Sequence, residues 1–359
     1  MSKKNALVVG VTGISGSNVA DHLLANGFTV FGLARRPPQD RKGVTPVAAD
    51  LMDPASIAKA VAGLDISHVY FCTWARQDTE DENCRVNGAM LRNLLDAVTQ
   101  TSKPDHVALV TGLKHYLGPF ESYGKVKPDT PFREDQARLP YQNFYYVQED
   151  ILYEAAAQHG FAWSVHRPHT LIGWALGNAM NMGVTLAVYA AICKETGRKL
   201  LFPGTPQQHE AVTDVTDARI LARQLVWAST TPSAFNQAFN IVNGDVFRWR
   251  RLWATIGAHL GVEVETYPGH PTPLEQQMAG MDATWDAIVT KYGLQSYKLS
   301  TLASWWHSDA DLGRELETFT DMTKSREFGF LDLQVTERSF TDLFDRLRAE
   351  KIIPPASAG

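Results

Sequence analysis

The first half of the chain alternates between short apolar runs and longer segments with helical spacing. Most of the runs are apolar throughout, which is typical of strands buried on both faces of a sheet. Strands of this kind that alternate with helices indicate a parallel sheet covered on both sides. The sequence therefore predicts an α/β fold with a doubly wound parallel sheet. The expected strands are residues 6–11, 29–34, 44–49, 68–73, 106–111, 162–167 and 238–243, and the expected helices are residues 17–26, 54–62, 83–101, 144–159, 182–196 and a helix within 213–228 that has cap candidates at 213–217.

Three glycines, Gly10, Gly13 and Gly16, form a GxxGxxG array between the first expected strand and the first expected helix. Glycines at this place let the backbone approach a pyrophosphate, which binds at the N-terminus of the helix. A glycine pattern alone is a weak signal, but a second strand follows at the spacing of a βαβ unit. The array predicts a dinucleotide-binding site, and a simple turn between packed elements is the alternative.

Two arginines follow the second expected strand, at the place where residue type distinguishes the two nicotinamide cofactors. An acidic residue there would bind the ribose 2′-hydroxyl and repel a 2′-phosphate. Arg35 and Arg36 instead offer two guanidinium groups, which suit a phosphate. The sequence therefore favours NADP(H) over NAD(H), with a pair of solvated surface arginines as the alternative. Asp50, after the third strand, is a candidate either to accept from the adenine amino group or to cap the helix that begins at Pro54.

Composition and charge exclude several classes of protein. The chain has 359 residues, 44% of them hydrophobic, which is enough to bury a large core. A net charge of −5 and no Lys/Arg run longer than two argue against nucleic acid as a partner. The longest later apolar stretch, residues 184–193, is too short for a membrane helix of about 20 residues. Three scattered cysteines, and an HxxH pair without a third ligand, predict neither disulfides nor a metal site, so we expect a cytoplasmic protein.

The order of segments changes after residue 168, and from residue 245 onward the chain is mostly helical and rich in Trp. We expect a dinucleotide-binding core at residues 1–175, completed by about 211–245, and a substrate-binding lobe formed by 176–210 and 246–359. In folds of this kind the helices expected at 83–101 and 144–159 form a dimer seam, so a homodimer is expected. The tryptophans expected to pack in the core of the lobe are Trp249, Trp253, Trp305 and Trp306.

The segment NFYYVQEDIL, residues 143–152, departs from the usual pattern of short-chain reductases. In those enzymes a catalytic Tyr donates a proton to the substrate, and a Lys four residues later lowers the pKa of its phenol. Here Tyr145 is followed at that distance by Glu149. Residues four apart share one face of a helix, so Glu149 must point away, be neutralised or work differently.

A substitute cation is available in the segment TGLKHYLGPF, residues 111–120. It follows the strand expected at 106–111 and therefore lies at the carboxyl end of the sheet, where ligands bind. Lys114, three residues past that strand, is placed to reach the same oxygen as Tyr145 from the opposite side. A lone lysine on a loop is usually solvated, but His115, Tyr116, Phe120 and Tyr123 make this an aromatic loop unlike an ordinary surface.

Several further segments strengthen this interpretation, and together they cover nearly the whole chain. With them the sequence resembles the progesterone 5β-reductase and iridoid synthase-like (PRISE) enzymes, which are atypical extended short-chain reductases. The pair TGxKHYxGPF and NFYYxxED is far more specific than any glycine pattern. The segments that carry the resemblance are GVTGISG, FGLARR, AADLMD, FCTWA, TGLKHYLGPFESYGK, NFYYVQEDIL, WSVHRP, VYAAICK and FNIVNGDVFRW.

The resemblance implies a Rossmann-type core and an NADPH-dependent 1,4-reduction of the C=C bond of enones or enals. Hydride would reach the β-carbon, and Tyr145 with Lys114 would stabilise the enolate oxygen as the catalytic pair. The cofactor contacts implied by the resemblance and by the glycine array are Gly10, Thr12, Gly13, Ile14, Gly16, Arg35, Arg36, Asp50, Leu51, Thr73, Trp74, Val110, Tyr145, Leu171, Asn178, Ala179 and Met180.

The expected substrate pocket comprises Trp74, Leu117, Phe120, Tyr123 and His307. Two of these residues depart from the plant members, which commonly have Phe at the place of His307 and Met at that of Leu117. A polar His at the lid of the pocket is a candidate to orient a different enone or to donate a proton to the enolate carbon. A capping histidine outside the pocket is the alternative.

Two other functions remain open from the sequence. A carbonyl reductase or an NAD-dependent epimerase on the same fold would need the Tyr-xxx-Lys pattern that is absent here, and for sugars it would not need Arg35 and Arg36. A non-catalytic NADP sensor would keep the glycine array but would have no use for both Tyr145 and Lys114.

Overall fold

Seven parallel strands form the central sheet of this computed structural model, which describes residues 4–119, 128–178 and 180–356. The spatial order is β3-β2-β1-β4-β5-β6-β9. From β1 the chain first adds strands on one side of the sheet, β2 and β3, and then adds strands from β4 onward on the other side. This reversal of strand order is the arrangement of a Rossmann-type sheet. The strands are β1 (Asn5–Val9), β2 (Thr29–Ala34), β3 (Val44–Ala48), β4 (His68–Phe71), β5 (His106–Val110), β6 (Ala162–Pro168) and β9 (Gln237–Ile241).

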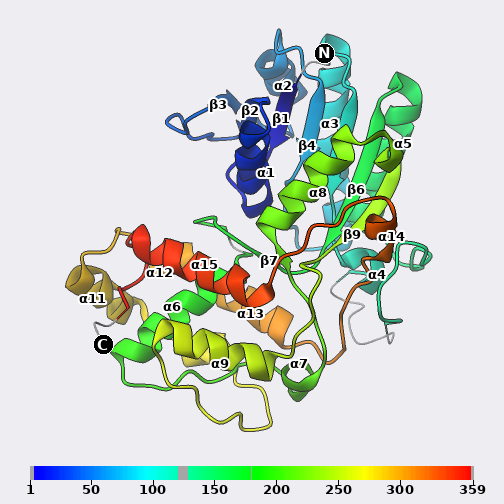
Figure 1. Cartoon of the computed structure of the whole chain (residues 1–359). Helices are drawn as coiled ribbons and strands as arrows, with labels where there is room; N and C mark the ends of the chain where they lie inside the picture. The colour runs from blue at the N-terminus through cyan, green and yellow to red at the C-terminus, as the bar shows by residue number, and fades with distance from the viewer. Residues whose placement is uncertain (1–3, 120–127, 179, 357–359) are drawn as a thin grey trace.

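Helices cover both faces of this sheet (Figure 1). Helices α1 (Ile14–Ala25) and α8 (Ala218–Thr230) pack on one face, with Val8 and Tyr70 from the strands in their core. The other face holds α2 (Pro54–Val61), α3 (Glu80–Thr101) and α5 (Phe144–His159), with Leu7 and Val69. Successive side chains of a strand point to opposite faces, so each buried strand supplies both cores.

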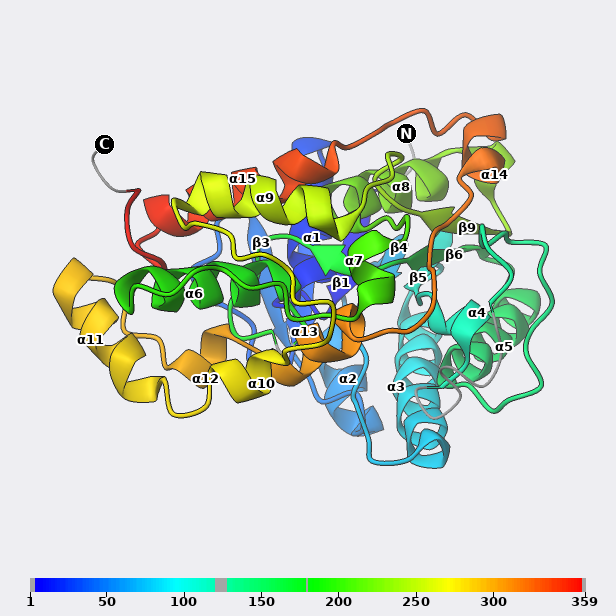
Figure 2. The same ribbon diagram turned by 90° about the horizontal axis from the view of Figure 1, so that it is seen from below.

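A further hydrophobic core lies in a helical lobe at the carboxyl ends of the strands (Figures 1 and 2). A short strand pair, β7 (Leu171–Ile172) with β8 (Thr216–Asp217), lies where the sheet meets this lobe. The remaining helices, most of them in this lobe, are α4 (Lys114–Leu117), α6 (Met182–Glu195), α7 (Pro206–Glu210), η2 (Pro232–Ala234), α9 (Trp249–Leu260), α10 (Leu274–Gln277), α11 (Asp282–Tyr292), α12 (Leu299–Leu302), α13 (Trp305–Leu312), α14 (Thr323–Glu327) and α15 (Thr336–Ala349).

The seven expected strands and the doubly wound parallel sheet are confirmed, with bounds that differ by up to two residues. Two expected helices begin three residues earlier than the sequence suggested, at Ile14 and at Glu80. For α3 the reason is local, because Thr79 caps the helix by accepting from the amide of Glu82. Acidic residues in that first turn also suit the positive end of the helix dipole.

Helix α6 contains the apolar stretch at residues 184–193, and it is buried in the core of the lobe. Within the described residues, no helix is both long enough and apolar enough to cross a membrane. The proposed boundaries between a cofactor core and a substrate lobe stay a prediction.

Candidate active site

A hollow of about 290 Å³ opens at the carboxyl ends of the strands, and residues from both halves of the chain line it. The glycine turn after β1 and the segments after β4, β5 and β6 line it, as do α5 and α13. Ligands of parallel α/β sheets bind at this edge, where the strand order reverses. The residues predicted from the sequence that line the hollow are Gly13, Ile14, Thr73, Trp74, Val110, Lys114, Leu117, Tyr145, Leu171, Asn178, Met180 and His307.

The glycine turn is packed so tightly that two of its residues cannot carry a side chain. Gly10 has φ +82°, and a Cβ there would lie 2.8 Å from the Cβ of Thr73. A Cβ on Gly16 would lie 2.2 Å from the carbonyl oxygen of Gly10. Gly13 caps α1 without a side chain, and the first turn of that helix carries no acidic residue. The turn therefore fits a pyrophosphate, and only Gly13 of the three glycines faces the hollow itself.

The residues predicted to bind the adenosine end lie outside this hollow, at the tips of β2 and β3. These two strands pair in register at Ala34 and Ala48, so their carboxyl ends are neighbours. Arg35, Arg36 and Asp50 are exposed there, and Leu51 is buried beside them, while Thr12 is exposed in the glycine turn. Helix α2 is capped by Asp53, so the alternative role of Asp50 as its cap is wrong.

Lys114 opens the one-turn helix α4, where the sequence predicts a loop. Its side chain is buried, and its ammonium lies 5.0 Å from the ring centre of Phe144 and 5.7 Å from that of Trp74. The two rings stack on each other. The ammonium also lies 3.9 Å from a carboxylate oxygen of Glu80 on α3. A buried ammonium beside a stacked aromatic pair, with a carboxylate nearby, is not the solvated lysine of the alternative.

Tyr145 lies in the first turn of α5 and is buried beside Phe144. The helix begins there because the side chain of Asn143 caps it, accepting from the amide of Tyr145 at 3.0 Å. Gly112 faces the phenol, since a Cβ at that position would come within 3.4 Å of its hydroxyl oxygen. Gly112, after β5, therefore lies in contact range of Tyr145 at the edge of the hollow.

Glu149, one turn after Tyr145, is buried and neutralised. One carboxylate oxygen lies 3.2 Å from Arg167 and the other lies 2.9 Å from Arg138. Burial alone would raise the pKa of Glu149, but the nearby His115 and the two guanidinium groups lower it to about 2. Of the three possibilities that the sequence left open, neutralisation is the one observed.

The wall formed by α13 and the turn after β6 is polar and charged, which the sequence analysis missed. Arg314 donates to Nε2 of His169 at 2.8 Å, and Nδ1 of His169 lies 2.7 Å from Asp214. A guanidinium can only donate, so the proton of His169 is on Nδ1. Arg314 also pairs with Asp311, which accepts from Thr170 at 2.8 Å. We name Thr170, His169, Asp214, Asp311 and Arg314 the polar wall.

His307 lines the same hollow, so the alternative of a capping residue outside the pocket is wrong. Its Nε2 lies 3.9 Å from Asp311. Burial lowers the pKa of His307, Asp311 opposes this, and Arg314 and Arg76 add to it. The HxxH pair of the sequence is His166 and His169, and His166 is buried between Gln224 and Ser164. Within the described residues, no group of three or more His, Cys, Asp or Glu is arranged to hold a metal ion.

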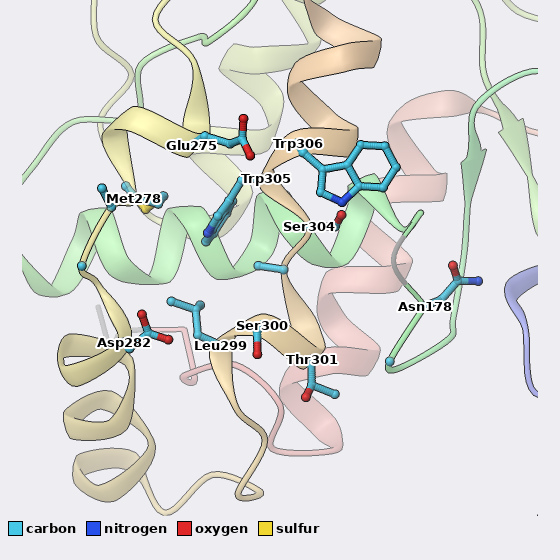
Figure 3. A pocket seen from close by; sticks show the side chains of 14 residues that line it. Asn178, Glu275, Met278, Asp282, Leu299, Ser300, Thr301, Ser304, Trp305 and Trp306 are labelled. Atoms are coloured by element: carbon cyan, nitrogen blue, oxygen red, sulfur yellow. The ribbon is translucent and has the colours of Figure 1, made fainter. Parts of the chain in front are cut away.

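A larger hollow, of about 710 Å³, lies within the helical lobe (Figure 3). The ring of Trp305 projects into it, and Asn178 lines both hollows. Trp249 and Trp253 are in the lobe core, as expected, and the half-buried Trp305 packs against it, whereas Trp306 lies outside this core under the guanidinium of Arg76. Neither Lys114 nor Tyr145 lines this larger hollow, and the smaller one is the candidate active site.

Three predicted residues, Phe120, Tyr123 and Ala179, lie outside the described part of the chain.

Several known proteins are similar to this chain over nearly its whole length. The (S)-8-oxocitronellyl enol synthase of Nepeta racemosa is 40% identical over 361 residues, which cover 97% of this chain and 93% of that protein. The 3-oxo-Delta(4,5)-steroid 5-beta-reductase of Arabidopsis thaliana is 39% identical over 362 residues, with the same coverage. Among solved structures, the UDP-glucose 4-epimerase of Thermus thermophilus in complex with NAD has a TM-score of 0.66.

That epimerase is 18% identical, and the match covers 96% of this chain and 99% of that structure, so it shows the fold alone. The relatives and the glycine turn together identify an oxidoreductase. The profile of the PRISE-like Rossmann-fold domain matches residues 47–354, and the chain belongs to this family.

Proposed function

We propose that this protein is an NADPH-dependent reductase that saturates the C=C bond of enones or enals by 1,4-addition. The observation that supports this best is that Lys114 and Tyr145 line one hollow with the glycine turn, while Glu149 is paired elsewhere. The cation of Lys114 thus lies in the same site as Tyr145, although the sequence position where short-chain reductases have their lysine is occupied by Glu149. The names of the steroid reductase and enol synthase relatives point in the same direction.

The residues present suit an NADPH molecule, which supplies a hydride when it is bound. The amides at the start of α1 would hold its pyrophosphate. Arg35 and Arg36 would hold the 2′-phosphate, and Asp50 and Leu51 would contact the adenine. The nicotinamide end would be held by Thr73, Trp74, Val110, Leu171, Asn178 and Met180.

The proposed task of the protein side chains is to stabilise charge on the carbonyl oxygen of the substrate. That oxygen becomes an enolate when the β-carbon is reduced, so the hydroxyl of Tyr145 donates to it and the ammonium of Lys114 stands beside it. One positioned donor at such an oxygen is worth about 3 kcal/mol of barrier. The stacked rings of Trp74 and Phe144 keep water away from the ammonium and so strengthen its field.

Product identification tests this function. The purified protein is incubated with NADPH and 2-cyclohexenone, and the products are separated by gas chromatography. We expect cyclohexanone, the saturated ketone. The allylic alcohol would indicate reduction of the carbonyl, and no product from a panel of cyclic enones and linear enals would contradict the proposal.

We also propose that two copies associate through α3 and α5, which pack against each other and are joined by an ion pair between Arg92 and Glu154. Together they would form a four-helix seam with a second copy. The mass of the particle in solution, measured by light scattering, tests this, and a monomer would contradict it.

A further inference from the structure

The side chain of Asn143 joins the backbones of the two proposed catalytic residues. Its Oδ1 accepts from the amide of Tyr145 at 3.0 Å, and its Nδ2 donates to the carbonyl of Lys114 at 2.7 Å. The side chain is buried, so neither bond competes with solvent. Helix α4 lies beside the start of α5 (Figure 2), and this carboxamide bridges them together with the hydroxyl of Tyr146, which donates to the carbonyl of His115 at 2.6 Å.

Glu80 makes a second link between α4 and the start of α5, at the ammonium group of Lys114. Its Oε1 accepts from the amide of Phe144 at 2.8 Å, and its Oε2 lies 3.9 Å from Nζ of Lys114. Asn83, one turn further along α3, donates to Oε2 at 3.1 Å and so fixes the rotamer of Glu80. The carboxylate therefore holds the ammonium near the residue that precedes Tyr145.

Helix α4 needs such support because it consists of a single turn. A helix of four residues is not stable on its own, since nucleation costs more than one turn recovers. A lysine side chain is also long and flexible, and ordering it costs free energy. Without external contacts, neither the backbone nor the ammonium of Lys114 would keep a fixed position relative to Tyr145.

We propose that Asn143 and Glu80 are positioning residues, which together hold Lys114 at a fixed place beside Tyr145. We name the pair the lysine clamp. The inference rests on the proposed function for its consequence in catalysis, but the geometry of the lysine clamp can be tested without turnover.

The substitution Asn143→Asp isolates the contact with Lys114. Aspartate caps a helix as well as asparagine does, so the bond to the amide of Tyr145 is kept. The donor to the carbonyl of Lys114 is lost, and a carboxylate oxygen takes its place. We expect kcat on the enone to fall at least tenfold, with little change in KM. If this variant does not fold, Asn143→Ser keeps a cap and also removes the amide donor.

Asn181 offers a matched control. It is equally buried and caps α6, and its Nδ2 also donates to backbone carbonyls, those of Gly173 and Ala175. Asn181→Asp therefore reproduces the cost in stability without touching Lys114. Equal losses of kcat in the two variants at equal melting temperatures would overturn the role of Asn143.

The substitution Glu80→Gln tests the second link through charge. Glutamine keeps an acceptor for the amide of Phe144 but removes the negative charge beside the ammonium. Two charges 4 Å apart interact strongly enough to move a titration by about one pH unit. We expect the ammonium of Lys114 to lose its proton at a pH lower by about that amount, whereas Glu80→Asp keeps the charge and leaves the titration closer to that of the wild type.

Other titratable groups near Lys114 do not account for the expected change in the titration of its ammonium. Burial raises the pKa of Cys84 to about 11, Glu80 and Asp81 add to the effect and Lys114 opposes it, so this thiol is neutral at lower pH. The pKa values of His307 and Asp311 are lowered, which moves their titrations towards acid. Tyr145 is distinguished by the labelling described next, which reports on lysine alone.

The closing experiment is a pH titration by NMR of the full-length protein labelled with ¹³C at Cε of lysine, with Lys114→Met to identify the Lys114 signal. A shift of about one unit in Glu80→Gln supports the lysine clamp, and an unchanged titration overturns the role of Glu80. This readout does not depend on turnover. A wild-type protein that reduces no enone would contradict the proposed function while the titration still decides the proposed role of Glu80.

Discussion

Glu149 forms a buried ion pair with Arg167, one helical turn after Tyr145. The acid therefore belongs to a charge network that includes Arg138 and His115, and none of these three residues lines the hollow. Its position in the sequence matches that of the lysine in ordinary short-chain reductases, but its surroundings would reject a cation. The absence of Tyr-xxx-Lys is thus a feature of the packing and not a sign of an inactive enzyme.

Glu149→Lys, which recreates the usual sequence pattern, is expected to destabilise the protein. It would place a third cation between Arg138 and Arg167, and breaking a buried pair costs about 3–5 kcal/mol. Urea unfolding measures the free energy. Glu263→Lys is the control, because Glu263 is exposed in a pair with Lys199 outside the proposed seam and an exposed pair is worth about 1 kcal/mol or less. Similar stability of the two variants would show that the network around Glu149 is unimportant.

Stability is expected to fall between pH 6.5 and pH 4, in part because of His166. Burial lowers the pKa of His166 to about 4, and Gln224 opposes the effect only weakly. His166 binds its proton near pH 6.5 in the unfolded chain and only near pH 4 in the folded chain. The free energy of unfolding therefore falls by on the order of 3 kcal/mol as the pH drops through this window. Below pH 4 the contribution is constant. His166→Gln should flatten the dependence of unfolding free energy on pH, and an unchanged slope would contradict this.

Tyr145→Phe and Lys114→Met are each expected to lower kcat for enone reduction about a hundredfold. Each removes one group that stabilises the developing enolate. Initial rates of NADPH consumption measure the loss. Tyr153→Phe, on the same helix but packed against Trp163, is the matched control and should keep full activity. Full activity of either catalytic variant would refute the assignment.

Replacing Arg35 and Arg36 together with Gln is expected to raise KM for NADPH more than tenfold while KM for NADH changes little. Each guanidinium bond to a phosphate contributes roughly 1.5–3 kcal/mol. Both residues are exposed at the tip of β2, so stability should not change. Lys42→Gln, an exposed change nearby, is the control. Equal effects on the two cofactors would remove the preference for NADPH.

His307→Phe is expected to shift the substrate preference towards large apolar enones. His307 lines the hollow next to the polar wall, and a phenyl ring there would replace a polar surface by an apolar one. The measurement is the ratio of kcat/KM for a steroid 4-en-3-one to that for 2-cyclohexenone, which should rise about tenfold for roughly 1–2 kcal/mol of added burial. An unchanged ratio would place His307 outside the substrate contacts.

Much of the fold was determined by the sequence alone. The seven strands and the glycine turn follow from local patterns, because a strand buried on both faces must be apolar throughout and a close turn admits no Cβ. Lys114 and Tyr145 could be placed near each other since both follow the carboxyl edge of a parallel sheet. The reasoning needed only the order of the segments and their spacing.

Only the tertiary structure decided how the charged groups of the site are paired. The polar wall joins His169 to Asp214 and to Arg314, residues that are 45 and 145 positions away along the chain. The direction of Glu149 likewise depends on Arg138 and Arg167, which come from other segments. A buried charge must find its partner wherever packing brings one, and no spacing within a single segment specifies that contact.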